Sequence, residues 1–298
     1  MKKVIERLLV FIIGLPAVYA IVILLPYRNN LALNIVTVFF SAMGAVEFST
    51  MLEKKNIFIS KIESFILGAL IPLAFTLTAS ARLSFDIIIP ILPMVCAMWI
   101  LLSKVFSKSS EIEAITGQII GKFALLAYPG LFICWLVIMS WWLENPAAIL
   151  LFLFITFGTD SAAWLFGSLF GKNNKGIIPV SPNKSIAGFI GGILGSVIVA
   201  VGAILIFPDV FSSIPPKLLL SEFGVSPQSM IIKAAILGLC TGIAASLGDL
   251  AESAIKRSCD CKDSGNFMLG RGGVLDSIDS IAFAAPVFFF LFIMFFPF

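Results

Sequence analysis

The densest group of ionisable side chains lies within residues 248–280. Six of the 17 acidic residues fall there, namely Asp249, Glu252, Asp260, Asp263, Asp276 and Asp279. Four basic residues are interspersed with them, namely Lys256, Arg257, Lys262 and Arg271. Carboxylate oxygens suit Mg²⁺, which usually bridges protein carboxylates to substrate phosphates, while lysine and arginine neutralise phosphate oxygens. The segment therefore predicts a magnesium-assisted reaction on a phosphate-bearing substrate.

The spacing places two sets of these side chains on helical faces, because residues three and four positions apart are neighbours on a helix. The sets are Asp249, Glu252, Ser253 and Lys256, and then Asp276, Asp279 and Ser280. Each lies at the end of an apolar run, where a carboxylate is costly unless it faces a partner or a watery cavity. Two helix ends with carboxylates at one level indicate a site; incidental ion pairs at a solvated helix end are the alternative.

A second polar cluster, residues 172–185, ends immediately before an apolar run. Its last five residues are Ser181, Pro182, Asn183, Lys184 and Ser185. Proline and small polar residues are typical of a helix start, where free backbone N–H groups can bind phosphate. From this segment alone, an ordinary capped loop is an equally good interpretation.

Two acidic residues lie inside apolar runs. Asp160 follows Gly158-Thr159, and Glu47 lies much nearer the N-terminus. An acidic residue within a membrane-spanning segment should have a partner or a role. We rank Glu47 below Asp160, because Glu47 is the more isolated of the two.

The elements that must position these residues are membrane helices. Hydrophobic residues make up 59% of the 298-residue chain and charged residues 12%, whereas soluble domains carry about 25% charged residues. A spanning helix needs about 20 mostly apolar residues. Nine runs qualify: 7–26, 31–52, 65–80, 86–102, 119–143, 147–170, 186–207, 230–255 and 279–297. We therefore predict an all-α, polytopic bundle of about nine transmembrane helices.

Two details refine this bundle. Pro129-Gly130 should kink or split the fifth run, because proline removes a helical hydrogen bond. Gly188/Gly192 and Gly191/Gly195 are small-xxx-small pairs, which favour close packing of the seventh run with another helix. These glycines also make a homodimer conceivable.

Orientation follows from the distribution of Lys and Arg. Fifteen of them fall in one set of loops: Lys2, Lys3, Arg7, Lys54, Lys55, Lys61, Lys104, Lys108, Lys172, Lys175, Lys184, Lys256, Arg257, Lys262 and Arg271. The opposite loops hold Arg28, Arg82 and Lys217. We predict a cytoplasmic N-terminus, an outer C-terminus and a multi-pass protein of the cell (inner) membrane. Residues 1–145 would form about five spans, and residues 146–298 would carry the polar motifs at the cytoplasmic face.

Composition also argues against several functions. The chain has no histidine, which weakens a zinc site or a histidine general base. A net charge of +3 without an arginine-rich arm argues against nucleic-acid binding. The five cysteines lack the spacing of a disulfide framework.

The motifs resemble those of phosphatidate cytidylyltransferases. The resemblance spans about residues 158–280 and includes Gly248-Asp249-Leu250-Ala251-Glu252, Ser253-Ala254-Ile255-Lys256-Arg257, Lys262-Asp263-Ser264-Gly265 and Gly272-Gly273-Val274-Leu275-Asp276-Ser277-Ile278-Asp279. Asp160-Ser161-Ala162-Ala163-Trp164 and Ser181-Pro182-Asn183-Lys184-Ser185 resemble two further family motifs. Arg271 and Ser277 stand where the family usually has His and Arg.

The resemblance implies transfer of cytidylate from CTP to phosphatidic acid, releasing pyrophosphate. It implies Asp249 and Asp276 as Mg²⁺ ligands, with Glu252 and Asp279 in reserve and a second cation possible. Lys184, Lys256, Arg257 and Lys262 would hold phosphates, with Arg271 as a further cation. Ser181 and Asn183 would orient CTP, Asp263 would orient Lys262 or reach the metal, and Ser185 and Asp160 would complete the substrate site.

Other functions share parts of this pattern. A CTP-dependent lipid-alcohol kinase or an ether-lipid cytidylyltransferase would use the same metal and phosphate chemistry. An ion-coupled transporter could use Asp160, Asp249 and Asp276, but such proteins often show related halves. We find no internal repeat, and the carboxylates cluster towards one membrane face.

Overall fold

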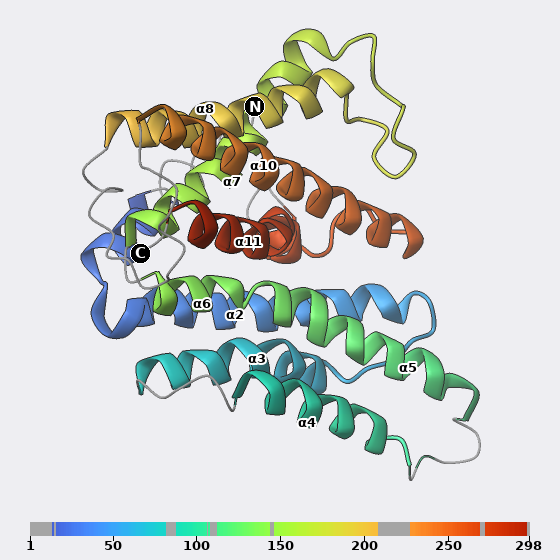
Figure 1. Ribbon diagram of the computed structural model, residues 1–298. Coiled ribbons are helices and arrows are strands. Elements are labelled where there is room, and N and C mark those ends of the chain that lie inside the picture. Colours follow the sequence, from blue (N-terminus) through green and yellow to red (C-terminus); the bar gives the residue numbers. More distant parts are fainter. Residues whose placement is uncertain are drawn as a thin grey trace. The chain divides into compact units, whose positions relative to one another are not determined.

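The computed structural model describes Gly14 and residues 16–81, 88–105, 107, 112–143, 146–207, 227–268 and 272–296. Every regular element within these residues is a helix (Figure 1). The chain forms two compact units. Unit 1 comprises Met1–Trp142 and Ile255–Ile278, and unit 2 comprises Leu143–Ala254 and Asp279–Phe298. The segment that carries much of the motif therefore packs with the N-terminal helices.

Unit 1 contains most of the helices. In chain order they are η1 (Ala20–Leu24), α2 (Tyr27–Glu53), α3 (Lys61–Ser80), α4 (Ile88–Leu102), α5 (Ile112–Leu125), η3 (Leu126–Phe132) and α6 (Trp135–Trp142). Unit 2 contains α7 (Pro146–Phe170), α8 (Ile186–Ile206), most of α10 (Pro227–Ser258) and most of α11 (Leu275–Phe295).

Seven helices in the described part of the chain are long and apolar enough to cross a membrane. They are Tyr27–Glu53, Lys61–Ser80, Ile112–Trp142, Pro146–Phe170, Ile186–Ile206, Ser229–Ser258 and Leu275–Phe295. The fourth predicted run holds a shorter apolar helix, Ile91–Leu102, and most of the first lies outside the described residues. The all-α, multi-pass fold is confirmed, whereas nine spans and their orientation stay predictions.

In unit 1, α2 and α3 form an antiparallel pair that is joined by hydrogen bonds along its length. Asn29 Nδ2 donates to the Ala79 carbonyl at 3.0 Å. The buried Ser41 hydroxyl lies 2.6 Å from the carbonyl oxygens of both Gly68 and Pro129. Pro129 belongs to η3, a π-helical turn between α5 and α6, so the predicted interruption of the fifth run is confirmed. These hydrogen bonds hold α2 against α3 and η3 within unit 1.

In unit 2, α7 packs closely against α8. A Cβ added to Gly191 would overlap the Phe166 ring, and one added to Gly195 would overlap the Ala162 methyl group. The predicted role of the glycine pairs in close helix packing is confirmed. The same unit joins α7 to α11, where the Phe152 and Phe288 ring centroids lie 5.3 Å apart.

Candidate active site

The loop between α10 and α11, residues 259–274, carries much of the motif and belongs to unit 1. Lys256, near the end of α10, and Asp276, near the start of α11, form an ion pair with 2.5 Å between Nζ and Oδ1. Their side chains are only 10% and 7% exposed. A carboxylate this deeply buried needs several donors to replace its lost hydration.

Asp276 receives those donors from the same loop. Its Oδ2 accepts hydrogen bonds from the Ser264 N–H at 2.9 Å and the Gly273 N–H at 2.7 Å, and the Ser264 hydroxyl oxygen lies 3.0 Å away. With Lys256 on the other oxygen, both carboxylate oxygens are engaged. Asp276 therefore ties two points of the loop to the first turn of α11 and fixes the ammonium group of Lys256.

A second carboxylate reaches this loop from α2. Glu47 is 8% exposed, and its Oε1 accepts a hydrogen bond from the Val274 N–H at 2.9 Å. Its Oε2 accepts from the Leu275 N–H and the Ser264 hydroxyl, each at 2.9 Å. Sequence reasoning ranked Glu47 low because it is isolated in the sequence, and its partners in the structure are more than 200 residues away. The available signal was the cost of an acidic residue inside a membrane helix.

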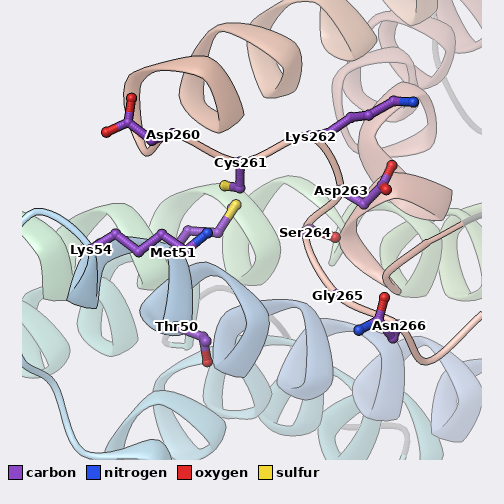
Figure 2. Close-up of a pocket in the computed structure, with 10 residues that line it drawn as sticks. All are labelled: Thr50, Met51, Lys54, Asp260, Cys261, Lys262, Asp263, Ser264, Gly265 and Asn266. Carbon is purple, nitrogen blue, oxygen red and sulfur yellow. The ribbon is translucent and has the colours of Figure 1, made fainter.

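A cavity of about 470 Å³ lies between the loop and the end of α2 (Figure 2). The residues that line it are Thr50, Met51, Lys54, Asp260, Cys261, Lys262, Asp263, Ser264, Gly265 and Asn266. Lys262 and Asp263, two predicted site residues, are exposed there, and Lys54 approaches from α2. Charged residues of the loop and of the end of α2 therefore line one cavity, and the motifs did not indicate the contribution of α2.

An exposed ion pair includes Asp260, which lines this cavity. Lys55 Nζ lies 2.6 Å from Asp260 Oδ2. The hydrogen bond raises the pKa of Lys55 and, together with the lysine charge, lowers the pKa of Asp260. Burial raises the pKa of the nearby Cys261 thiol. The pair joins the α2–α3 connection to the α10–α11 loop, so both lie at one end of unit 1.

Unit 2 contains a second lysine–aspartate pair. Lys184 Nζ lies 2.5 Å from Asp249 Oδ2, with side chains 32% and 34% exposed. Lys184 comes from the loop before α8, and Asp249 comes from α10. A candidate phosphate-binding cation and a candidate metal-binding carboxylate therefore form an ion pair with each other.

Further acidic groups surround this pair. Asp279 is buried in α11, and the carboxylates that act on it electrostatically are those of Asp249, Glu252 and Asp160. Glu252 is fully buried. Close packing brings α10 to this point, since a Cβ on Gly248 would lie 2.6 Å from the Asp279 carbonyl oxygen. Unit 2 thus brings together four of the predicted acidic residues from three helices.

The loop before α8 is folded on itself. Ser185 is the N-cap of α8, and its buried hydroxyl accepts a hydrogen bond from the Gly188 N–H at 3.0 Å. The predicted helix start is confirmed. The Lys184 N–H donates to the Ser181 carbonyl at 3.0 Å, and Asn183 is exposed. The cap fixes the backbone from which Lys184 reaches Asp249.

The predicted residues therefore fall into two groups. Unit 1 holds Lys256, Arg257, Lys262, Asp263 and Asp276. Unit 2 holds Asp160, Ser181, Asn183, Lys184, Ser185, Asp249, Glu252 and Asp279. Arg257 is exposed and donates to the Cys261 carbonyl at 3.1 Å. Arg271 lies outside the described residues.

The donor set of unit 2 fits a divalent cation in charge and chemistry. Hard carboxylate oxygens are the ligands that Mg²⁺ prefers, and a cation would relieve the repulsion around Asp279. Among the described residues, no three His, Cys, Asp or Glu side chains are gathered closely enough to hold one ion. Ion binding would therefore have to rearrange these side chains, beginning with the Lys184–Asp249 pair, whose side chains are about one-third exposed.

The fold and the site define a class: a multi-pass membrane protein with lysine–carboxylate pairs at the ends of its helices. The sequence profile of the Cytidylyltransferase family matches residues 5–295. The chain belongs to this family.

Several curated proteins are similar to the chain. Phosphatidate cytidylyltransferase of Staphylococcus saprophyticus is 36% identical over 129 residues, which is 43% of this chain and 42% of that protein. Its namesake in Staphylococcus aureus strain COL is 39% identical over 133 residues, with the same shares. Uncharacterized protein YnbB of Escherichia coli K12 is 35% identical over 149 residues, 50% of this chain and 43% of that protein. The chain thus spans less than half the length of these relatives.

Proposed function

We propose that the protein is a phosphatidate cytidylyltransferase, which converts CTP and phosphatidic acid to CDP-diacylglycerol and pyrophosphate in phospholipid biosynthesis. The observation that carries this proposal is the pairing of motif lysines with motif carboxylates, Lys256 with Asp276 and Lys184 with Asp249. Membership of the Cytidylyltransferase family and the names of the staphylococcal relatives support the choice of substrates.

The reaction is a displacement at phosphorus. A phosphate oxygen of phosphatidic acid attacks the α-phosphorus of CTP and forms a new P–O–P anhydride. The bond from the α-phosphorus to the bridging oxygen breaks, and pyrophosphate leaves with the electron pair. A phosphate monoester is largely ionised near neutral pH, since its second pKa is about 6. The chain needs no strong general base for this step, which suits a sequence without histidine.

The basic residues would stabilise the charge on the phosphates. Lys184, Lys256, Arg257 and Lys262 would bind phosphate oxygens, and Arg271 would add a further cation. Such fixed charges favour phosphoryl transfer mainly by positioning and electrostatic stabilisation. Ser181 and Asn183 would orient CTP. Ser185 would act indirectly, because its hydroxyl caps α8 and fixes the backbone next to Lys184.

The acidic residues would hold Mg²⁺. Asp249 and Asp276 are the proposed ligands, with Glu252 and Asp279 in reserve and a second cation possible. The bound ion would supply charge neutralisation for the triphosphate. Asp160 would belong to the substrate site, and Asp263 would orient Lys262 beside the cavity.

The reaction requires access to cytosolic CTP and to a lipid headgroup, so we place the site at the cytoplasmic face of the cell (inner) membrane. The basic loops support this placement. We further propose that the protein can form a homodimer. The glycines of α8 face α7 and are not available for it, whereas Ile190 and Leu194 of the same helix are exposed. We propose no nucleic-acid partner.

Pyrophosphate release by the purified protein in detergent tests this proposal. CTP, Mg²⁺ and phosphatidic acid are supplied together, and Asp249→Ala is the control variant. Lipid-dependent pyrophosphate release that disappears in the variant is expected. Release of CDP would instead identify a lipid kinase, and preference for a diether analogue would identify an ether-lipid enzyme. Absence of turnover with every acceptor would overturn the enzyme assignment and favour transport.

A further inference from the structure

We propose that Glu47, within α2, is a positioning residue that holds the α10–α11 loop in its working conformation. The consequence for turnover rests on the proposed function, whereas the consequence for the order of the loop does not. The family motifs lie within residues 158–280, so Glu47 is far outside them in sequence.

The contacts of Glu47 require a carboxylate. Both of its oxygens act only as acceptors, from the N–H groups of Val274 and Leu275 and from the Ser264 hydroxyl. Glutamine has nearly the same size, but its amide NH₂ is a donor. In either orientation, that NH₂ would face a backbone N–H. The site therefore selects glutamate specifically rather than any polar side chain of similar length.

The first turn of α11 strengthens this preference. The first N–H groups of a helix have no partner within the helix, and the helix dipole favours a negative charge there. Glu47 accepts the Leu275 N–H at the first residue of α11 and the Val274 N–H just before it. Because Glu47 lies on α2, these bonds fix the start of α11 to the helical framework of unit 1.

Ser264 connects Glu47 to the buried Lys256–Asp276 ion pair. Its hydroxyl oxygen lies 2.9 Å from Glu47 Oε2 and 3.0 Å from Asp276 Oδ2. The same oxygen accepts the Asp276 N–H at 3.3 Å. Asp276 in turn holds Lys256 at 2.5 Å. A continuous series of contacts therefore runs from α2 through Glu47, Ser264 and Asp276 to a proposed phosphate-binding lysine.

The loop is also shaped around the Glu47 side chain. A Cβ added to Gly265 or to Gly273 would overlap the Glu47 carboxylate. Only glycine at these two positions lets the backbone approach so closely. The two glycines and the carboxylate thus fit together as one unit, and a change on either side should displace the loop.

Thiol labelling measures the order of the loop without requiring turnover. Cys261 is partly buried at the start of the loop, whereas Cys134, in the same unit, is fully buried. Maleimide incorporation at each cysteine is measured by mass spectrometry in wild type, Glu47→Gln and the control Glu53→Gln. Glu53 is on the same helix, at its C-terminal end. We expect roughly tenfold faster labelling of Cys261 in Glu47→Gln alone, with Cys134 unchanged, because local opening exposes the thiol.

Turnover measurements separate positioning from general stability. Glu47→Gln should lower kcat roughly 10- to 100-fold, with a smaller change in KM, because misplaced groups act chiefly on the transition state. Ser264→Ala should have a similar effect, and the double variant should be little worse than the more impaired single variant. Glu47→Asp, which keeps the carboxylate, should recover part of the activity.

If Cys261 in Glu47→Gln is labelled at the wild-type rate, the proposal is overturned. Fully additive effects of Glu47→Gln and Ser264→Ala on kcat would also overturn it. If Glu47→Gln also exposes Cys134, the variant has unfolded. The Cys261 labelling rate of Glu47→Asp then tests the proposal. Slower Cys261 labelling in Glu47→Asp than in Glu47→Gln would support the proposal, and equal labelling in a folded Glu47→Asp variant would refute it. If the wild type releases no pyrophosphate, the proposed function fails while the labelling result stands.

Discussion

The two units each contain a lysine–aspartate pair from the same family motifs, but the pairs differ in their surroundings. Lys256–Asp276 in unit 1 is almost fully buried, and Asp276 also accepts two backbone hydrogen bonds from the loop. Lys184–Asp249 in unit 2 has side chains about one-third exposed and lies near other carboxylates. Both pairs have a separation of 2.5 Å, so the distance does not distinguish them.

The two pairs differ in how easily a ligand can separate the lysine from the aspartate. A buried, fully hydrogen-bonded pair is costly to break, because removing one partner leaves an uncompensated charge. A partly exposed pair exchanges partners readily, because water compensates each group. We therefore expect Lys184–Asp249 to open readily when phosphate and Mg²⁺ bind, and Lys256–Asp276 to keep the loop preorganised until the ligands replace its contacts.

Breaking the buried pair should have the largest effect. Lys256→Met should lower the free energy of unfolding by about 3 kcal/mol, as expected for loss of one partner of a buried pair. The matched variant Lys184→Met should cost less than about 1 kcal/mol, as for exposed pairs. Unfolding in detergent, followed by circular dichroism, measures both. Equal destabilisation by the two variants would remove the distinction between the pairs.

The partly exposed pair Lys184–Asp249 should instead affect turnover. Asp249→Asn should lower kcat by roughly 100-fold or more, the usual cost of losing one electrostatic group at a reacting phosphate. The unfolding midpoint should stay near that of wild type. Pyrophosphate release and thermal unfolding are measured on the same preparation. A variant that unfolds early but keeps its turnover per folded molecule would contradict this assignment.

Alanine at two loop glycines should sharpen the comparison between the units. Gly273→Ala would force a Cβ into Glu47 and Ser264, and overpacking of this kind costs about 1–3 kcal/mol. Gly176, in the loop before α8, has open space around it but a φ of +82°. Gly176→Ala should therefore cost only about 1 kcal/mol, from backbone strain. The unfolding midpoints of the two variants are measured and compared. A larger decrease in midpoint for Gly176→Ala than for Gly273→Ala would contradict the tighter packing around the loop of unit 1.

The exposed Lys55–Asp260 pair should have the smallest effect. The hydrogen bond lowers the pKa of Asp260, so its contribution is present above the ordinary aspartate pKa and is lost as pH falls through the lowered value. The raised pKa of Lys55 makes its contribution present below the ordinary lysine pKa and lost as pH rises through the raised value.

The difference in unfolding midpoint between wild type and Lys55→Ala should therefore be small and constant from about pH 5 to pH 9. It should shrink at lower pH, as Asp260 becomes protonated. Thermal unfolding at a series of pH values measures this difference. A midpoint difference that grows on acidification would show that Lys55 acts through another group.

Much of the fold was accessible from the sequence. Long apolar runs predict spanning helices because each helix must satisfy its own backbone hydrogen bonds in lipid. Pro129 predicted the interruption of its helix, Ser185 the start of α8, and the glycine pairs the close packing of α8 on α7. All of these are local features, whose physical cause lies within a few residues of the chain or on one face of a helix.

The candidate site was accessible only in part. Residue type and spacing predicted that acidic and basic residues of the motifs belong to one site, and ion pairs join some of them in each unit. Neither spacing nor composition indicated which carboxylate each lysine contacts. Those contacts depend on how the loops fold back on the helices, which involves residues far apart in the chain.

The sequence by itself determined that the protein is a multi-pass helical membrane protein with acidic and basic motif residues, because hydrophobicity and residue type are properties of each segment. Only the tertiary structure decided that Asp276 is buried while Asp249 is partly exposed, and that Glu47 binds the α10–α11 loop. Burial and hydrogen bonding depend on every element packed around a group. Here one of those elements is α2, more than 200 residues before the loop it holds.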